Sequence, residues 1–187
     1  MKRFLIAAAL AASLSACGST PREQFYAFEP PHAPGAADGP LLVLKQVSVP
    51  ELLQRPQLVL REGTRVTLLE QQRWAEPLAS GVAQYLRARL QQLLPGWRVI
   101  SREQQLRSAP GWEAQIDLHS MDLLAARGVQ LSAMVQLQPP QGARQSQQHS
   151  LAQTCAGCEP AQLVAAQQQL LDQLAQQIAA RVQGKAP

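Results

Sequence analysis

The clearest pattern in the chain is a pair of segments in which apolar and polar residues alternate. The first covers residues 112–119 and the second covers residues 129–138. Alternation with a period of two gives a strand one apolar and one polar face, as in an antiparallel sheet that is covered on one side. The two segments therefore predict a β-hairpin whose apolar face lies on a core. A third segment, 146–154, is more polar and predicts an edge strand.

Two other segments have apolar residues at steps of three and four, the period of a helix with one buried face. The first is 77–94, where Pro77 suits a first-turn position and a Pro-Gly pair follows the last leucine. The second is 159–182, with Pro160 at an early helical position. Its many glutamines lie between leucines and alanines with helical spacing, which indicates a solvated helix face.

Shorter apolar segments predict the remaining strands. Residues 41–49 are apolar at adjacent as well as alternate positions, which suits a strand buried on both faces. Further strands are predicted at 58–60, 66–69 and 97–100. Together the elements predict an α+β fold: a single two-layer domain over 41–187, with a mixed, mostly antiparallel sheet and two long helices packed on one face.

Residues 17–40 predict a tether, because prolines and glycines are too frequent there for a core to form. Three aromatic residues interrupt this segment: Phe25, Tyr26 and Phe28. Two interpretations of this aromatic cluster remain open. It forms a short strand that docks on the domain, or it is a patch that touches lipid or a partner protein.

Residues 1–16 have the parts of a bacterial secretory signal: a cationic start, an apolar run over 4–14, and small residues before Cys17. In a helix the apolar run covers about 16 Å, too little for a bilayer core of roughly 30 Å. Leu-Ser-Ala before Cys17 resembles the lipobox of bacterial lipoproteins, which implies that the signal peptide is removed and that Cys17 carries the lipid. The alternative is an ordinary secretory signal with a chance cysteine.

The lipobox resemblance also predicts where the mature protein is held. Gly18 follows Cys17, whereas the signal for retention in the inner membrane is usually Asp at that position. The protein is therefore expected on the periplasmic face of the outer membrane, where two or more acyl chains give stable anchoring. The formal net charge of +4 decreases when Lys2 and Arg3 leave with the signal, so the charge does not predict nucleic-acid binding.

Cys155 and Cys158 form a C-x-x-C motif before the second predicted helix. A helix N-terminus favours a thiolate, so one interpretation is a thiol oxidoreductase. The chain after Cys158 is too short for the further strands of a thioredoxin-like fold, which favours a structural disulfide in an oxidising compartment.

Other candidates for chemistry are weak. A zinc site at the cysteine pair would need two more ligands, but His32 lies in the tether and the remaining histidines, His119 and His149, fall on polar strand faces. No G-x-S-x-G, P-loop or dinucleotide-binding motif is present. The sequence therefore predicts no catalytic residue, no metal ligand and no cofactor.

Two motifs in register resemble a known family. Residues 47–61, VSVPELLQRPQLVLR, are similar to the V-x-V-P-x-x-L-x-R-x-Q-I-V-x-R segment of the ABC-type transport auxiliary lipoproteins, the PqiC- or YmbA-like proteins. Residues 73–78, RWAEPL, are similar to that family's R-W-A-E-P-L motif at its usual distance downstream. The resemblance covers nearly the whole mature chain. The edge strand at 146–154 and the cysteine pair are not part of the family pattern.

The resemblance implies a periplasmic accessory subunit of an envelope lipid-transport system that supports membrane integrity, with no enzymatic activity. The implied partners are an MCE-domain protein that bridges the periplasm and carries lipid, and an ABC-type or permease component in the inner membrane. A homo-oligomer would suit a channel mouth. The alternative is a structural or chaperone-like outer-membrane lipoprotein without a transport partner.

Arg73, Trp74 and Glu76 of the second motif allow two interpretations. In the structural one, Trp74 packs as a hydrophobic staple before the helix, and Glu76 favours the helix N-terminus through its negative charge. In the functional one, the three residues form a docking surface for the bridging partner.

Overall fold

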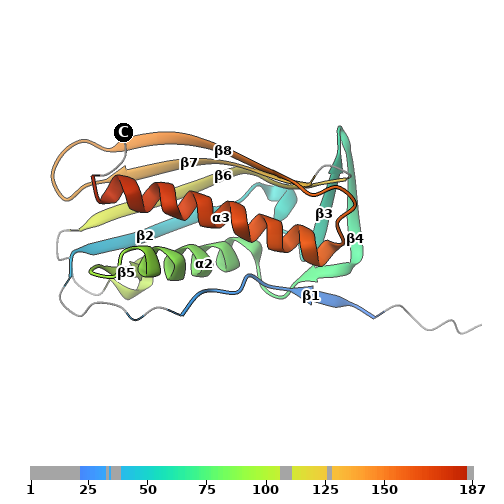
Figure 1. Ribbon diagram of the computed structural model, residues 1–187, viewed down its shortest axis with the longest axis horizontal. Coiled ribbons are helices and arrows are strands. Elements are labelled where there is room, and N and C mark those ends of the chain that lie inside the picture. Colours follow the sequence, from blue (N-terminus) through green and yellow to red (C-terminus); the bar gives the residue numbers. More distant parts are fainter. Residues whose placement is uncertain (1–21, 33, 35–38, 106–110, 126–127, 185–187) are drawn as a thin grey trace, which may run out of the picture.

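The computed structural model describes residues 22–32, 34, 39–105, 111–125 and 128–184. There, eight strands form one mixed sheet, and two long helices, α2 (Leu78–Leu93) and α3 (Pro160–Val182), cover one of its faces (Figure 1). The predicted α+β fold is therefore confirmed. The predicted signal peptide and Cys17 lie outside the described residues.

Strand β6 (Trp112–Leu124) is the centre of the sheet. Strand β7 (Gly128–Gln138) pairs with it in antiparallel orientation along most of its length, and β8 (Gln145–Thr154) pairs with β7 in the same way. Both predicted hairpin segments are thus confirmed. Within the described residues β7 is the only partner of β8, as expected for an edge strand.

The other edge of β6 is shared by two parallel strands. Strand β2 (Leu41–Ser48) pairs with the first part of β6, and β3 (Gln57–Glu62) pairs with Leu123 and Leu124 near its end. Strand β5 (Arg98–Ser101) then pairs with the first residues of β2. The sheet is mixed, with long antiparallel pairings on one side of β6 and shorter parallel ones on the other.

A second group of strands stands at one end of the main sheet, at the right of Figure 1. Strand β3 leads through a turn into β4 (Arg65–Trp74), and Gly63 in that turn has a φ of 58°, in the left-handed region that favours glycine. Strand β1 (Gln24–Tyr26) pairs in parallel with the end of β4. One of the two interpretations of the aromatic cluster was a short strand that docks on the domain, and β1 is that strand.

Local sequence explains where both helices begin. Pro77 is the N-cap of α2, one position before the first-turn position that the sequence predicted. Pro160 begins α3 as predicted. Glu159 caps α3 in a capping box with Gln162, in which each side chain accepts a hydrogen bond from the other residue's backbone N–H. Two short 3₁₀ helices, η1 (Glu51–Leu53) and η2 (Arg102–Gln104), complete the described elements.

The core lies between the sheet and the helices. The helical stripes bury Leu78, Val82, Tyr85, Leu86 and Leu90 of α2 and Leu163, Leu170, Leu171, Leu174, Ile178 and Val182 of α3. Each large aliphatic side chain buried in this way contributes about 1.5–3 kcal/mol. The opposite face of the sheet is polar, with Lys45 paired to Glu113 at 2.9 Å and Ser48 donating a hydrogen bond to Asp117 at 2.8 Å. No helix in the described part of the chain is long and apolar enough to cross a membrane.

Candidate functional site

The R-W-A-E-P-L motif lies where β4 ends and α2 begins. Trp74 is the last residue of β4, and its indole is 9% exposed and packs against Phe28 with the ring centroids 5.1 Å apart. Its backbone N–H donates to the carbonyl oxygen of Pro56 at 2.7 Å. The Trp74 side chain therefore belongs to the core, which leaves little of it available to a partner.

Arg73 and Glu76 form the accessible part of the motif. A guanidinium nitrogen of Arg73 lies 3.0 Å from a carboxylate oxygen of Glu23, just before β1. Glu76 lies directly before the N-cap of α2 and accepts a hydrogen bond from Gln84 at 2.7 Å. The motif thus presents one cation and one anion on a surface that is held in place by the buried Trp74.

The segment that leads to the predicted anchor is attached to this end of the domain. The backbone N–H of Ala75 donates to the carbonyl oxygen of Tyr26 at 2.8 Å, and the backbone N–H of Glu29 donates to the side-chain oxygen of Gln168 at 2.9 Å. Burial, and then the negative charge of Glu159, raise the pKa of the Tyr26 phenol. The aromatic cluster is therefore divided: Phe28 is buried, whereas Phe25 is 62% exposed and remains available to lipid or protein.

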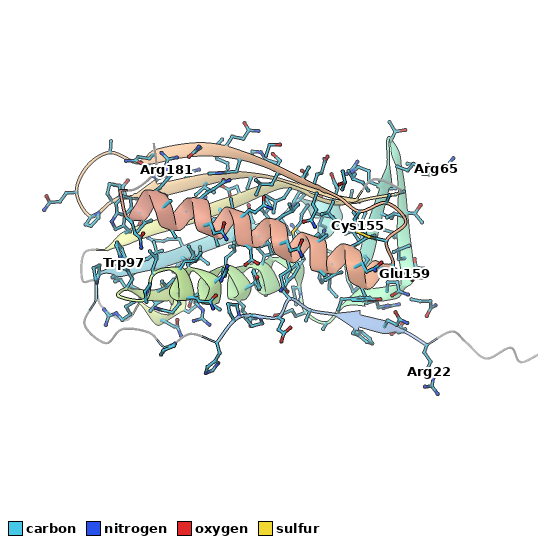
Figure 2. The ribbon with its side chains drawn as sticks, in the orientation of Figure 1. Arg22, Arg65, Trp97, Cys155, Glu159 and Arg181 are labelled. Carbon is cyan, nitrogen blue, oxygen red and sulfur yellow. A yellow bond between two sulfur atoms is a disulfide. The ribbon has the colours of Figure 1, made fainter. Side chains whose placement is uncertain are left out.

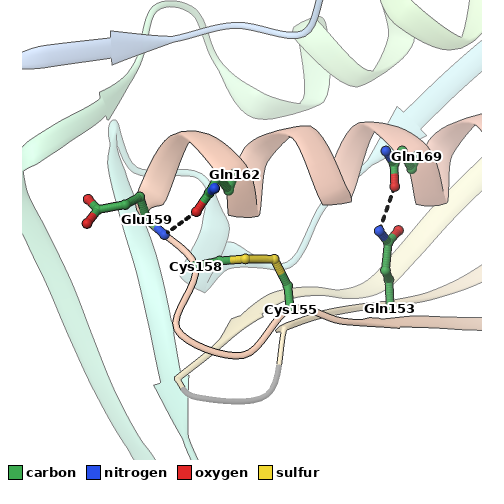
Figure 3. The surroundings of a disulfide bond; sticks show 6 residues. All are labelled: Gln153, Cys155, Cys158, Glu159, Gln162 and Gln169. Atoms are coloured by element: carbon green, nitrogen blue, oxygen red, sulfur yellow. Dashed lines mark hydrogen bonds between the residues drawn. A yellow bond between two sulfur atoms is a disulfide. The ribbon is translucent and has the colours of Figure 1, made fainter.

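Cys155 and Cys158 lie before the capped N-terminus of α3 (Figure 3). Their Cα atoms are 5.6 Å apart, within the usual range for a disulfide, and the two sulfur atoms face each other at bonding distance. Figure 2 shows Cys155 and Glu159 at the same end of the molecule as Arg22, the first residue that the structure describes.

An apolar hollow of about 270 Å³ lies beside the cysteine pair and is lined by Leu60, Leu69, Leu124, Ala125, Gly157, Pro160 and Leu163. Sequence analysis did not single out this hollow, because the residues that line it come from separate elements.

The histidines do not join the cysteines in a site. His32 and His119 are exposed, and His149 is buried on β8 with its Nδ1 hydrogen-bonded to Gln177 of α3. Within the described ranges no three residues of the types His, Cys, Asp and Glu are grouped as a metal site requires.

Sequence analysis did not identify a polar cluster between the two helices. The Tyr85 hydroxyl of α2 donates to the Asp172 carboxylate of α3 at 2.7 Å, and Arg89 lies 2.7 Å from the same oxygen. Burial and then the hydrogen bond to Asp172 raise the pKa of Tyr85 well above its usual value. A neutral phenol paired with a carboxylate and a guanidinium joins α2 to α3, so the cluster is structural.

Comparisons with known proteins give a family and a fold. The family model described as "ABC-type transport auxiliary lipoprotein component" matches residues 26–179. Among curated proteins no significant match is found.

Two crystal structures share the fold. One, of an uncharacterized protein, has 21% identity and a TM-score of 0.74, covering 87% of this chain and 99% of the other. The second, of a Xanthomonas campestris protein from the DUF330 family, has 16% identity and a TM-score of 0.65, covering 85% and 95%.

Proposed function

Because the chain belongs to the family of ABC-type transport auxiliary lipoprotein components, we propose that it is an accessory subunit of an envelope lipid-transport system. Its transport partners are an MCE-domain protein that spans the periplasm and carries phospholipid, and an ABC-type or permease component in the inner membrane. The lipid on Cys17 anchors it to the periplasmic face of the outer membrane, where the system supports membrane integrity.

The observation that carries the proposal is the extent of the family match. Residues 26–179 run from the end of β1 into the last turns of α3, so the match includes both long helices and all strands after β1. The fixed path from β1 to Glu29 supports a domain whose anchored end is held in a defined orientation.

Arg73 and Glu76 are proposed as part of the docking surface. Their support is geometric: one cation and one anion lie at the surface around a buried tryptophan, close to the strand that leads to the anchor. Trp74 contributes by holding the end of β4 in position. Cys155 and Cys158 are proposed to form a structural disulfide that fixes the start of α3.

The experiment that tests the proposal is purification of the tagged, lipidated protein from its own membranes in mild detergent, followed by mass spectrometry. Recovery of an MCE-domain protein together with a permease or ATPase is expected. Recovery of the lipoprotein alone, even after chemical cross-linking, overturns the proposal in favour of a structural lipoprotein without a transport partner. Cross-linked species of higher mass that contain this chain alone would instead reveal a homo-oligomer.

Two variants test the lipid anchor and the docking surface separately. Cys17→Ser is expected to give a folded protein that is absent from the outer-membrane fraction. Arg73→Ala is expected to lower recovery of the partner, with Arg98→Ala as its control, because Arg98 is an exposed arginine of β5 at a distance from the motif. Equal recovery of the partner by both arginine variants would remove Arg73 from the docking surface.

A further inference from the structure

Strand β2 has one edge that is only half occupied. Strand β5 pairs with residues 41–44. On the opposite edge, residues 46–48 pair with β6, and Lys45 lies at an irregularity in that pairing. In the described part of the chain no strand pairs with residues 45–48 on the edge that β5 uses, although the 3₁₀ helix η2, which follows β5, contacts β2. A strand edge without a neighbour presents N–H and C=O groups that can pair with another extended chain. Four residues of strand offer about 13 Å of such an edge.

A groove of about 590 Å³ lies beside this open edge. Leu44 and Val47 of β2 line one side, and Ala79 and Ala83 line the other from α2. The two alanines are one helical turn apart, so small side chains face the groove where larger ones would fill it. The groove therefore has room for a chain that lies along β2. Its helical side combines the two small apolar side chains with polar ones, and η2 adds the carboxylate of Glu103 to the lining.

A second hollow, of about 190 Å³, lies on the polar face of the sheet and meets the groove at the same edge, because Lys45 and Gln46 line both. Its charged lining residues are three cations, Lys45, Arg102 and Arg144, and one carboxylate, Glu113. Glu113 is already paired with Lys45. The hollow therefore has an excess of positive charge.

We propose that the open edge of β2 binds an extended segment of a partner protein by strand addition. Main-chain hydrogen bonds to residues 45–48 provide recognition of the backbone. The groove beside α2 and the cationic hollow on the polar face of the sheet then select the side chains that alternate along the segment. Apolar side chains face Ala79 and Ala83, and acidic side chains face Arg102 and Arg144. The proposal rests on the proposed function only for the identity of the partner as a subunit of the transport system.

The chemistry of the edge favours a polypeptide of another protein over other occupants. A lipid has no repeating row of donors and acceptors to match a strand edge. A second copy of this chain has an exposed edge at β8, but that strand, QSQQHSLAQT, contains no acidic residue to meet the cationic hollow.

The test places a photoreactive amino acid at position 46 of the full-length lipidated protein in its own cells. Gln46 is exposed and lines both hollows, and a photoreactive residue in place of the exposed Gln176 on α3 is the control. After irradiation, mass spectrometry identifies the cross-linked peptide. The expected product joins residue 46 to an extended segment of another envelope protein in which apolar and acidic residues alternate, and it is absent from the control.

Matched variants show whether the groove is used. Ala83→Trp fills the groove, and Ala88→Trp changes a half-buried alanine on the same helix that does not line it. Arg102→Glu reverses one charge of the hollow, with Arg98→Glu on β5 as its control. The yield of the cross-link is expected to fall about tenfold with Ala83→Trp, as for loss of a central contact, and to be kept with Ala88→Trp. Arg102→Glu, on an exposed residue that leaves the core intact, is expected to reduce the yield as well.

The possible outcomes separate this inference from the proposed function. Strand addition to a partner protein is overturned by any of three results. Position 46 cross-links to a second copy of this chain, positions 46 and 176 give the same products, or both Ala83→Trp and Arg102→Glu leave the yield unchanged. If purification recovers the transport system but position 46 does not cross-link to it, the function stands and the inference falls. If position 46 cross-links to a protein outside any transport system and both variants reduce the yield, strand addition is confirmed and the assignment of its partner to the transport system is overturned. The proposed function then falls as well if purification recovers no transport subunit.

Discussion

The hydroxyl of Tyr85 on α2 donates a hydrogen bond to the carboxylate of Asp172 on α3, with the two oxygens 2.7 Å apart. The Tyr85 ring packs against Phe28, with the ring centroids 5.9 Å apart, so the same side chain touches the segment that follows β1. One residue thus connects both long helices to the chain that leads to the predicted anchor. The stability of this junction is accessible to experiment.

Tyr85→Phe is expected to lower the free energy of unfolding by about 1.5–3 kcal/mol, the usual range for a hydrogen bond to a charged group. The ring and its packing are kept, so the loss reports the hydrogen bond to Asp172. Urea unfolding of the two proteins measures the difference. Tyr26→Phe is the control, because its hydroxyl is less buried and bonds to glutamine side chains. An equal loss in both variants would contradict a special role for the contact with Asp172.

The same residue predicts how stability depends on alkaline pH. Burial and the hydrogen bond to Asp172 raise the pKa of Tyr85 in the folded protein, whereas the unfolded chain titrates near 10. Above about pH 10 the unfolded state therefore loses a proton that the folded state retains, so stability present at lower pH is lost as the pH rises. Unfolding free energies measured from pH 8 to 11 should decrease less steeply for Tyr85→Phe than for the wild type.

Trp74→Ala is expected to lower the free energy of unfolding by about 3–5 kcal/mol, because it removes a large side chain from the core. Trp74→Phe should lower it by less, since a ring remains to pack on Phe28. Calorimetric melting measures both. A melting temperature of Trp74→Ala equal to that of the wild type would mean that the indole serves a partner rather than the core.

Much of the fold follows from local pattern. The alternation in β6 and β7 and the helical stripes of α2 and α3 each identify an element within one stretch of chain, and the structure contains all four. Strand β4 extends beyond the predicted 66–69 to Trp74. The prediction stopped too early because the last part of the strand is polar and shows no alternation of apolar and polar residues. Polar residues are tolerated there because β3 and β1 pair with both edges of β4.

The order in which the strands pair, and the candidate sites that this order creates, depend on contacts between residues far apart in the sequence. The spacing of residues within one segment does not predict such contacts. Nothing local indicates that β2 and β3 pair with successive parts of the same edge of β6, or that β5 ends halfway along β2. The groove between Val47 and Ala83 exists only because of that order. The sequence motif singled out Trp74, but it could not show that Trp74 packs against Phe28. Phe28 lies in a segment whose composition predicts only a tether.

The cysteine pair gives a redox prediction. In the proposed structural role, Cys155→Ser combined with Cys158→Ser lowers the free energy of unfolding by no more than about 2 kcal/mol, because the disulfide closes only a very short loop. A reductant should lower wild-type stability by the same amount and leave the double variant unchanged. Alkylation followed by mass measurement should detect no free thiol at these positions in the untreated protein. A disulfide-exchange activity that disappears in the double variant would instead support the thiol oxidoreductase interpretation.

Gly128 begins β7 with a φ of +122°, a backbone conformation that side chains disfavour. An added Cβ there would overlap the carbonyl oxygen of Gln153 and lie 2.6 Å from the backbone nitrogen of Cys155, so β8 would have to move. Gly142 also has a positive φ, of +112°, but the nearest atom to its added Cβ is 3.5 Å away. Gly128→Ala should therefore cost about 1–3 kcal/mol more than Gly142→Ala in urea unfolding, the usual cost of overpacking. Equal losses would mean that β7 and β8 separate easily at this end, and that the pairing next to Cys155 contributes little to stability.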